Sequence, residues 1–437
     1  VRAHERYGFN LYWRHAEKLV RTWSHEKIRE RQWSRLKAML SFAWKNIPFH
    51  RDRFNEAGIT PSSIKTPEDL NRIPIMTKAD IRANFPDRLV IPGRRFREWR
   101  LGQTSGSTAE SMHFIRPDNA DRRGLFYSVF LREGGITNHP IVILTTPHCT
   151  AGTCSLVEEQ KLHIHKIRKI AFLRHLDNMI ALPSNQKNIL AASDSYMNGL
   201  LNWLNQLPDS IMIVDPVYLA ALARFLQRTG VTPPRVRHIV STYELLTDSS
   251  RELFRNVFGC DTYTQYGGSE LLDVANECEA HTLHAMPDNA WVEVLRNGRP
   301  ATPGQTGKAV ITDLCNFNMP FIRYDIGDLL EVGKPDCPCG RHTDTYAACH
   351  GRTRDVLLLR SGGYVTPLQA DGIFRGARGV AFNQLVQENL DVYRISIVRS
   401  GNDIEVDTKE IAGRCRGMFG ERARCNIRLV DTIKPER

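Results

Sequence analysis

The spacing of apolar residues predicts a helical arm at the start of the chain, over about residues 1–90. Apolar side chains recur there every three or four positions, which places them on one face of a helix. That face is formed by Trp33, Leu36, Leu40 and Trp44, and Pro48 follows it. Thr66 and Thr77 supply capping hydroxyls at two further helix starts. Thr77 and Asp80 also have the spacing of a capping box.

From about residue 140 the pattern changes to short apolar runs that alternate with helical segments. The runs are 141–144, 211–214, 238–241 and 262–266. A helix that carries Leu219, Leu222 and Phe225 follows the second run, and another around 251–258 follows the third. Strands that alternate with helices predict a largely parallel sheet covered by helices.

The pattern becomes strand-rich after residue 285, with runs at 291–294 and 309–312. The end of the chain adds strand candidates near 392–398, 404–406 and 427–430. We therefore expect an α/β protein with a large N-terminal domain, residues 1–350, and a small C-terminal α+β domain, residues 351–437.

Length and charge narrow the classes of function. A chain of 437 residues exceeds the usual size of one compact core, which favours two or three domains. The net charge of +11 either keeps the surface soluble or attracts polyanions, among them ATP and CoA. No basic run is interleaved with stacking aromatic residues, so nucleic-acid binding is not expected.

The chain shows no pattern of a membrane or secreted protein. No uninterrupted apolar run approaches the roughly 20 residues that span a bilayer. The start at Val1 has no signal-peptide pattern and no Met, so we expect a trimmed or partial start. Ten cysteines in a chain of this length do not suggest a disulfide framework, and we expect the cytoplasm, where thiols stay reduced.

A first polar cluster could surround phosphate oxygens. It consists of Thr104, Ser105, Gly106, Ser107 and Thr108. Hydroxyls and backbone N–H groups around a glycine can donate hydrogen bonds to an anion from several sides. An ordinary Ser/Thr/Gly turn would have the same composition, so this cluster alone decides nothing.

A second cluster follows the last strand candidate of the parallel series. It runs through Tyr266, Gly267, Gly268, Ser269 and Glu270. Open parallel sheets bind ligands beyond the carboxyl ends of their strands. The aromatic ring could stack on a base, and the carboxylate could hold Mg²⁺ that bridges phosphates. The alternative is a tight turn with a surface Glu.

Two further clusters lie downstream. Asp328 follows Gly327, and an Asp in that position is suited to accept two ribose hydroxyls. Gly351 and Arg352 open the small C-terminal unit, and a guanidinium at this domain junction could lie near phosphate or ribose. Either cluster alone could be an ordinary surface turn.

The four clusters, in this order, resemble the adenylate-forming superfamily of acyl-CoA synthetases, adenylation domains and luciferases. The segments 43–50 and 73–78 resemble the phenylacetate–CoA ligase (CapK-like) family within it. The resemblance covers nearly the whole chain and is weakest between residues 145 and 205.

The resemblance implies a role for each cluster. Residues 104–108 would clamp the ATP phosphates, Tyr266 with Gly267 would lie beside adenine, and Glu270 would hold Mg²⁺. Asp328 would bind the ribose, and Arg352 would lie near the ribose and the developing phosphate charge. The acid would bind near His148 and residues 241–244, which makes Glu244 a further candidate. Thr104, Glu270 and Arg352 are the expected catalytic residues.

Three features depart from the family pattern. Directly after the phosphate cluster, Ala109 occupies a position where the family usually has Gly, and Glu110 follows it. Arg354 stands where the hinge Asp is usual, and Asp355 comes one position later. No Gly-Lys pair follows Gly351 to supply the catalytic Lys of the family. We expect such a loop beyond the terminal residues 434–437, and Lys434 is a poor substitute.

A Cys/His set predicts a structural zinc site. It comprises Cys278, His284, Cys337 and Cys339. Three thiolates and one imidazole suit tetrahedral Zn²⁺, and four protein ligands leave no position for a catalytic water. His281 is a rival to His284, and unligated buried cysteines are the alternative reading.

The resemblance implies ATP-dependent activation of a carboxylic acid, aryl or arylacetic by family default, to an acyl-adenylate. Pyrophosphate would leave, a small C-terminal domain would rotate, and CoA would accept the acyl group. An amine acceptor, a carrier protein acting in trans, or a degenerate nucleotide-binding protein remain alternatives. The expected cofactors are ATP, Mg²⁺, structural Zn²⁺ and CoA.

Overall fold

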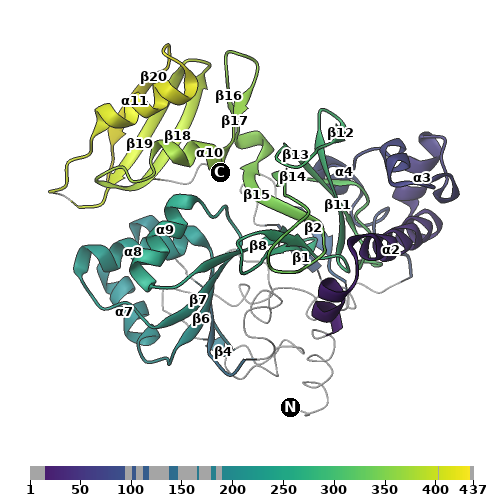
Figure 1. Cartoon of the computed structure of the whole chain (residues 1–437), viewed down its shortest axis with the longest axis horizontal. Helices are drawn as coiled ribbons and strands as arrows, with labels where there is room; N and C mark the ends of the chain where they lie inside the picture. The colour runs from purple at the N-terminus through teal and green to yellow at the C-terminus, as the bar shows by residue number, and fades with distance from the viewer. Residues whose placement is uncertain are drawn as a thin grey trace.

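The computed structural model describes residues 15–93, 101–104, 112–117, 137–145, 165–166, 179–183, 189–401 and 403–433. Phosphate-cluster residues Ser105 to Thr108, the departures Ala109 and Glu110, and His148 lie outside these ranges, as does Lys434. Figure 1 shows a large body built around one long sheet, with N-terminal helices at one end and a small C-terminal unit at the other. No helix in the described ranges is long and apolar enough to cross a membrane.

The helices fall into three groups along the chain. The N-terminal group is α2 (His25–Asn46), α3 (Pro48–Glu56), η1 (Pro61–Ser63), η2 (Pro67–Arg72) and α4 (Lys78–Asn84). The central group is η6 (Ile189–Ala191), α7 (Asp194–Leu204), α8 (Pro216–Thr229) and α9 (Asp248–Phe258). The C-terminal group is η7 (Thr353–Asp355), α10 (Pro367–Ala370), η8 (Asp371–Ile373) and α11 (Thr408–Phe419).

The predicted helical arm is present. Leu36 and Leu40 of α2 are fully buried, as the apolar spacing requires, and they pack on Trp291 of the sheet. Thr77 and Asp80 form the expected capping box at the start of α4. Thr66 starts η2, so that element is a 3₁₀ rather than an α-helix, although its capping box also forms.

One 13-stranded sheet runs through the large body. Its strands are β3 (Ile141–Thr145), β4 (His165–Lys166), β5 (Met179–Pro183), β6 (Ser210–Val214), β7 (Val236–Ser241), β8 (Thr262–Gly268), β9 (Leu272–Glu277), β10 (Leu283–Ala285), β11 (Ala290–Arg296), β12 (Arg299–Pro300), β13 (Thr306–Asp313), β14 (Tyr324–Val332) and β15 (Thr345–Arg352). Their order across the sheet is β12-β11-β13-β14-β15-β10-β9-β8-β7-β6-β3-β5-β4.

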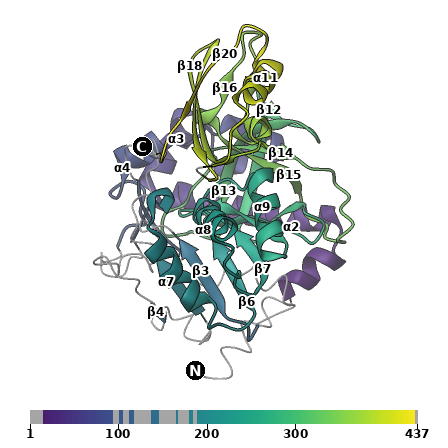
Figure 2. The same cartoon turned by 90° about the vertical axis from the view of Figure 1, so that its left-hand side faces the viewer.

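The sheet has a parallel half and an antiparallel half that meet at β8. Strands β5, β3, β6, β7 and β8 run parallel, which confirms the prediction from the alternating pattern. From β8 to the edge strand β12, every pair of neighbouring strands in the sheet order is antiparallel. Helices α7, α8 and α9 pack on the parallel half in one apolar cluster, and Figure 2 shows them in front of β6 and β7.

The antiparallel half is strongly curled. Three strands lie between β8 and β14 in the sheet order, so a flat sheet would hold these two about 19 Å apart. Yet the Tyr266 hydroxyl of β8 donates a hydrogen bond to Asp328 of β14 over 3.1 Å. Register shifts in the β8–β9, β13–β14 and β14–β15 pairs accompany this curl, because bulges bend and twist a sheet.

The N-terminal arm is joined to β14 through its backbone. Met76 pairs with Tyr324 as an isolated parallel bridge. The Met76 N–H donates to the Arg323 carbonyl over 2.8 Å, and the Asp325 N–H donates to the Met76 carbonyl over 2.9 Å. This bridge brings the start of α4 beside the strand that carries Asp328.

The C-terminal unit, residues 353–433, contains its own three-stranded sheet. Strands β18 (Val380–Asn389), β19 (Val392–Arg399) and β20 (Arg424–Leu429) pair in that order, and α11 packs on them. A small hairpin, β16 (Leu357–Leu358) with β17 (Tyr364–Val365), precedes them. A second small hairpin, β1 (Leu101–Gln103) with β2 (His113–Ile115), belongs to the large body. The domain boundary between residues 350 and 351 stays a prediction.

The strand expected at residues 404–406 is absent, and that prediction is wrong. This stretch connects β19 to α11 without joining the sheet. Val406 is buried in the apolar core of the C-terminal unit. Its apolar spacing therefore reflects a buried connection rather than a paired strand.

We predict that the buried ion pair beside the Met76 bridge is essential to stability. Arg323 makes two 3.0 Å contacts with Glu293 and donates to the Ile73 carbonyl over 2.6 Å. Arg323→Ala would leave Glu293 buried without its partner and lower the free energy of unfolding by about 3–5 kcal/mol. Urea denaturation would measure this change.

Arg228→Ala provides the matched control, because its ion pair with Asp194 is exposed. That substitution is expected to cost less than about 1 kcal/mol. Equal losses in the two variants would contradict the importance of the Arg323 contact.

Candidate active site

The junction of the two halves of the sheet gathers most of the predicted site residues. Tyr266 ends the parallel series on β8, and Glu270 lies in the short turn between β8 and β9. Both side chains are buried, with 6% and 4% of their surface exposed. A Cβ added at Gly268 would lie 3.0 Å from Glu270 Oε2, so the glycine leaves room for this carboxylate.

Asp328 links β8, β14 and β15. It accepts a hydrogen bond from the Tyr266 hydroxyl over 3.1 Å and forms an ion pair with Arg352 over 3.0 Å. Asp328 and Arg352 are also direct partners in the β14–β15 register. Burial raises the pKa of the Asp328 carboxyl, and Arg352 and Tyr266 oppose this effect. Burial disfavours the charge of Arg352, but Asp328 and Glu244 outweigh it and raise the pKa of the guanidinium.

Glu270 is held by a second tyrosine, Tyr324. The Tyr324 hydroxyl donates to Glu270 Oε1 over 2.9 Å, within the buried part of the sheet. Burial and the neighbouring Glu270 raise the pKa of Tyr324 well above its ordinary value, so the phenol stays protonated and remains a donor. The other oxygen, Glu270 Oε2, points toward the space kept open by Gly268.

Lys78 is a site residue that the sequence did not reveal. It is the first residue of α4, two positions after the Met76 bridge. Its ammonium lies 3.9 Å from the position of a Cβ added at Gly327, the residue before Asp328. Burial and Arg352 lower the pKa of Lys78, whereas Glu270 and Asp328 counteract them. The ammonium therefore faces the same place as these three groups.

Glu244 belongs to this group as well. It lies in the loop between β7 and α9, directly after Tyr243, whose φ of 76° is unusual for a bulky residue. Glu244 is exposed, but nearby protein atoms remove enough water from its carboxyl to raise its pKa, and Arg352 opposes the shift. The strained loop thus holds a carboxyl group toward Arg352.

Thr104 closes the base of a hairpin. Its N–H donates to the Met112 carbonyl over 2.9 Å, and its hydroxyl accepts from the Met112 N–H over 3.0 Å. Met112 packs in the same apolar cluster as Tyr266 and Ile326. Residues 105–108 of the predicted phosphate cluster lie between these two positions, outside the described ranges.

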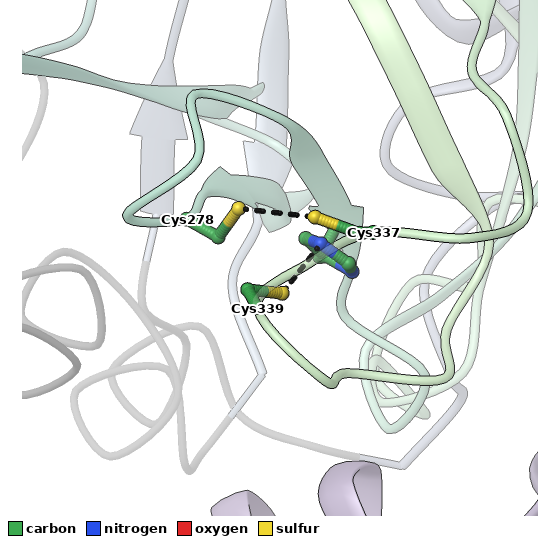
Figure 3. Close-up of side chains that lie close together, drawn as sticks. Cys278, Cys337 and Cys339 are labelled. Atoms are coloured by element: carbon green, nitrogen blue, oxygen red, sulfur yellow. Dashed lines mark hydrogen bonds between the residues drawn. The ribbon is translucent and has the colours of Figure 1, made fainter.

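The four predicted metal ligands come together at the far end of β9 and β10. The ligand atoms of Cys278, His284, Cys337 and Cys339 all lie within 4.8 Å of one another. The Cys278 and Cys337 sulfurs are 3.6 Å apart, and Cys339 Sγ is 3.2 Å from His284 Nε2 (Figure 3). Ligands at about 2.3 Å from a tetrahedral zinc would be about 3.8 Å apart, so the set matches such an ion closely.

The structure also decides between the two histidines. His281 has a positive φ of 55° and turns to Glu277, which its Nδ1 contacts over 2.8 Å. His284 Nδ1 contacts the Thr343 hydroxyl over 3.1 Å, which leaves Nε2 toward the cysteines. Burial and Arg341 lower the pKa of His284 to about 4, so the ring is neutral at pH 7, the form that binds a metal.

A buried polar contact lies on the strands beside the Glu270 turn. Gln265 of β8 donates a hydrogen bond to Asp273 of β9, which is 3% exposed. Burial raises the pKa of Asp273 to about 7, and the amides of Gln265 and Asn276 offset only part of that effect.

The described site residues therefore form two groups. Glu244, Tyr266, Glu270, Asp328 and Arg352 surround one place, together with Lys78 and Tyr324, which the sequence analysis did not assign. Lys78 stands in the segment 73–78 quoted for the family resemblance, but nothing in its spacing indicates a contact with β14. Carboxylates, guanidinium and ammonium at one partly buried place can bind the hydroxyls and phosphates of a nucleotide.

Solved structures identify the fold as that of the adenylate-forming CoA ligases. The chain superposes on 2-hydroxyisobutyryl-CoA ligase in the postadenylation state with a TM-score of 0.74, at 20% identity, covering 94% of this chain and 88% of that one. The TM-score is 0.62 for the thioesterification state and 0.60 for an open conformation of the same ligase.

The curated relatives are more specific than the fold. The chain is 26% identical over 399 residues to phenylacetate-coenzyme A ligase of Thermus thermophilus, covering 89% of this chain and 82% of the relative. It is 24% identical over 414 residues to the enzyme of the same name from Pseudomonas putida, covering 91% and 85%. No protein-family model matches the chain. These relatives confirm the resemblance to phenylacetate–CoA ligases.

We predict that Asp273 makes stability depend on pH. Its pKa of about 7 in the native state lies above the ordinary value of 3.8, so the native state binds this proton more tightly than the unfolded chain. The stabilisation is complete below about pH 4 and is lost as the pH rises through 7. Asp273→Asn removes the titration, so the free energy of unfolding of the variant minus that of the native chain should rise by about 3 kcal/mol from pH 5 to pH 8.

Urea denaturation of both chains at the two pH values would measure this difference. Because other groups titrate in both chains, only the difference between them reports on Asp273. A difference that is the same at pH 5 and pH 8 would contradict the shifted pKa.

Proposed function

We propose that this chain joins a carboxylic acid to ATP, forming an acyl-adenylate and pyrophosphate, and then transfers the acyl group to CoA. The observation that carries the proposal is the convergence of the buried Glu270 and Asp328 with the partly exposed Arg352 and Lys78 at one place. The named activities of the relatives, phenylacetate-coenzyme A ligase in each case, support the same reaction.

The cations at the site suit the phosphates of ATP. Arg352 has a carboxylate partner in Asp328, whereas Lys78 forms no hydrogen bond or ion pair with any residue in the described part of the chain. A half-buried ammonium without a partner is costly. A phosphate oxygen would supply the missing partner, so Lys78 is proposed to bind the phosphates beside the hydroxyls of residues 104–108.

Asp328 is proposed to bind the ribose. Tyr266 and Arg352 each contact one of its two oxygens, and each carboxylate oxygen has lone pairs to accept further hydrogen bonds. The two ribose hydroxyls are neutral hydrogen-bond donors, and a buried carboxylate whose charge is partly neutralised can accept a hydrogen bond from each. Tyr266 and Gly267, at the end of β8, are proposed to lie beside the adenine ring.

Glu270 is proposed as the ligand of Mg²⁺. One of its oxygens accepts from Tyr324, and the other faces the space beside Gly268, so a hard oxygen donor remains available. Bound Mg²⁺ would neutralise charge on the phosphates. Glu270 itself fixes the position of that charge, because Tyr324 restricts its side chain.

The proposed reaction has two steps. A carboxylate oxygen of the acid attacks the α-phosphorus in line, the bond to the bridging oxygen breaks, and pyrophosphate leaves with the electron pair. In the second step the CoA sulfur attacks the acyl carbon, AMP leaves with the electron pair, and the thiol proton passes to solvent. Lys78 and Arg352 would stabilise the charge that develops on the phosphate oxygens.

The acid is proposed to bind near residues 241–244, with an aryl or arylacetic acid favoured. Glu244 would contribute to this end of the site, since it already faces Arg352. CoA is favoured as the acceptor because every relative named above is a CoA ligase. No cysteine in the described part of the chain forms a disulfide, and the cytoplasm remains the proposed compartment.

The Cys/His set is proposed to hold a structural Zn²⁺. Its donor set and spacing suit the ion, and the Cys278 sulfur also accepts from the Ala280 N–H over 3.3 Å, a contact that favours a thiolate. The ion would tie the turn after β9 to residues 337–339. It would stabilise the fold and take no part in acid activation.

The proposed activity is tested by acid-dependent exchange of labelled pyrophosphate into ATP. A panel of carboxylic acids that includes aryl and arylacetic acids should contain at least one that supports exchange. Glu270→Gln keeps the shape but removes the charge that holds Mg²⁺, and we expect exchange to fall about 100-fold or more.

Glu56→Gln, on the exposed surface of α3, is the control and should exchange at the native rate. Exchange with no acid of the panel would leave a non-catalytic nucleotide-binding protein as the better reading. If an acid does support exchange, release of AMP with CoA compared with release with a panel of amines would identify the acceptor.

The zinc proposal has its own measurement. Elemental analysis of the purified chain should give about one zinc per chain, and Cys339→Ser should lose it with a lower melting temperature. Cys425→Ser, a free thiol in the C-terminal unit, serves as the control and should retain the ion. A native chain without zinc, whose melting temperature is unaffected by added zinc or by a chelator, would refute the site.

A further inference from the structure

The C-terminal unit docks on the large body at the first turn of α9. Asp371, in η8, accepts two hydrogen bonds from Ser249, one from its N–H over 3.1 Å and one from its hydroxyl over 2.8 Å. Ser249 is the second residue of α9, and Thr247 caps the same helix by accepting from the Ser250 N–H. The carboxylate of one unit therefore satisfies a free N–H and faces the positive end of a helix in the other.

Two further contacts surround this docking point. Arg375 pairs with Asp248 over 3.0 Å and approaches Glu252 to 3.7 Å, both on α9. Arg414 of α11 donates to the carbonyls of Ile373 and Arg375, which fixes the turn that carries Arg375.

An apolar contact completes the interface. Phe382 of β18 packs against the apolar cluster beneath α8 and α9. Elements η8 and β18 of the C-terminal unit thus both contact the part of the large body that carries α8 and α9.

The docking point is close to the candidate active site along the chain. The loop that ends at Thr247 carries Glu244, which faces Arg352, and Arg352 is the last residue of the sheet before the C-terminal unit. A contact between Asp371 and α9 therefore fixes both sides of this place. The chain superposes better on the postadenylation state of 2-hydroxyisobutyryl-CoA ligase than on its thioesterification state, which agrees with a unit that is not arranged for transfer to CoA.

We propose that Asp371 is a positioning residue, assisted by Arg375, that holds the C-terminal unit on α9 during acid activation and releases it for transfer to CoA. The proposal rests on the two-step reaction proposed above. Asp371 touches no reacting group; it acts by favouring one arrangement of the two units over another. Its contacts are partly exposed, and the Arg375 pairs are more than half exposed, so the interface is weak enough to open.

The test measures the two steps separately. The first is acid-dependent exchange of pyrophosphate into ATP, and the second is thioester formation from preformed acyl-adenylate and CoA. Asp371→Ala removes both hydrogen bonds to Ser249, Asp371→Asn keeps an acceptor, and Arg375→Ala removes the ion pairs. Arg255→Ala is the matched control, because Arg255 lies on the same helix and its pair with Asp261, just before β8, is similarly exposed and stays within the large body.

Asp371→Ala is expected to slow the first step about tenfold or more while the second stays at or above the native rate. Asp371→Asn should lose less, and Arg375→Ala only about twofold, a loss that 0.5 M salt should abolish. Arg255→Ala should leave both steps unchanged. An unchanged first step in Asp371→Ala, or equal losses in both steps, would overturn the proposal.

A distance measurement separates this proposal from the proposed activity. Spin labels introduced through genetically encoded groups at the exposed positions Gln227 and Lys409 would report on the two units without using the native cysteines. The native chain should give one dominant distance, and Asp371→Ala a broader or shifted distribution. If the native chain lacks exchange activity, the proposed function fails, whereas an unchanged distribution in Asp371→Ala refutes the docking role alone.

Discussion

The cost of burying the Asp328 carboxylate is the constraint on which the candidate site depends. A carboxylate with 7% of its surface exposed needs charged or hydrogen-bonding partners. Its two partners come from different parts of the chain, because Tyr266 ends the parallel half of the sheet and Arg352 ends the antiparallel half. The sheet can supply both only when it curls, and that curl also brings Glu270 and Tyr324 to the same place.

The rest of the site is attached to this centre by backbone contacts. The two hydrogen bonds of Met76 place the first residue of α4 beside β14. The turn after β8 fixes Glu270, and the loop before α9 fixes Glu244. Side chains therefore converge because strand ends and helix starts converge, as is general for open α/β sheets. The Cys278, His284, Cys337 and Cys339 side chains form a separate group at the other end of β9.

The parallel half of the sheet could be predicted from the sequence because its strands are short, continuous apolar runs between helices. Strands such as β9 and β15 are mixed and polar, so their pattern gave no signal. The stretch 404–406 gave a false strand signal, because a buried connection can show the same spacing of apolar residues as a strand. Motifs indicated Glu270, Asp328 and Arg352 as candidate site residues, whereas Lys78 depends on a pairing between distant segments. The sequence already favoured His284 over His281, and the backbone conformation at His281 agrees with that choice.

The attachment of Lys78 has a consequence for how sequences of this kind diverge. The contacts that locate it are made by the main chain of Met76 and β14, and main-chain hydrogen bonds do not depend on which side chains flank them. The arm can therefore accumulate substitutions while the ammonium keeps its position. Descendants of this sequence could lose recognisable similarity in the arm long before they lose the charge that it delivers.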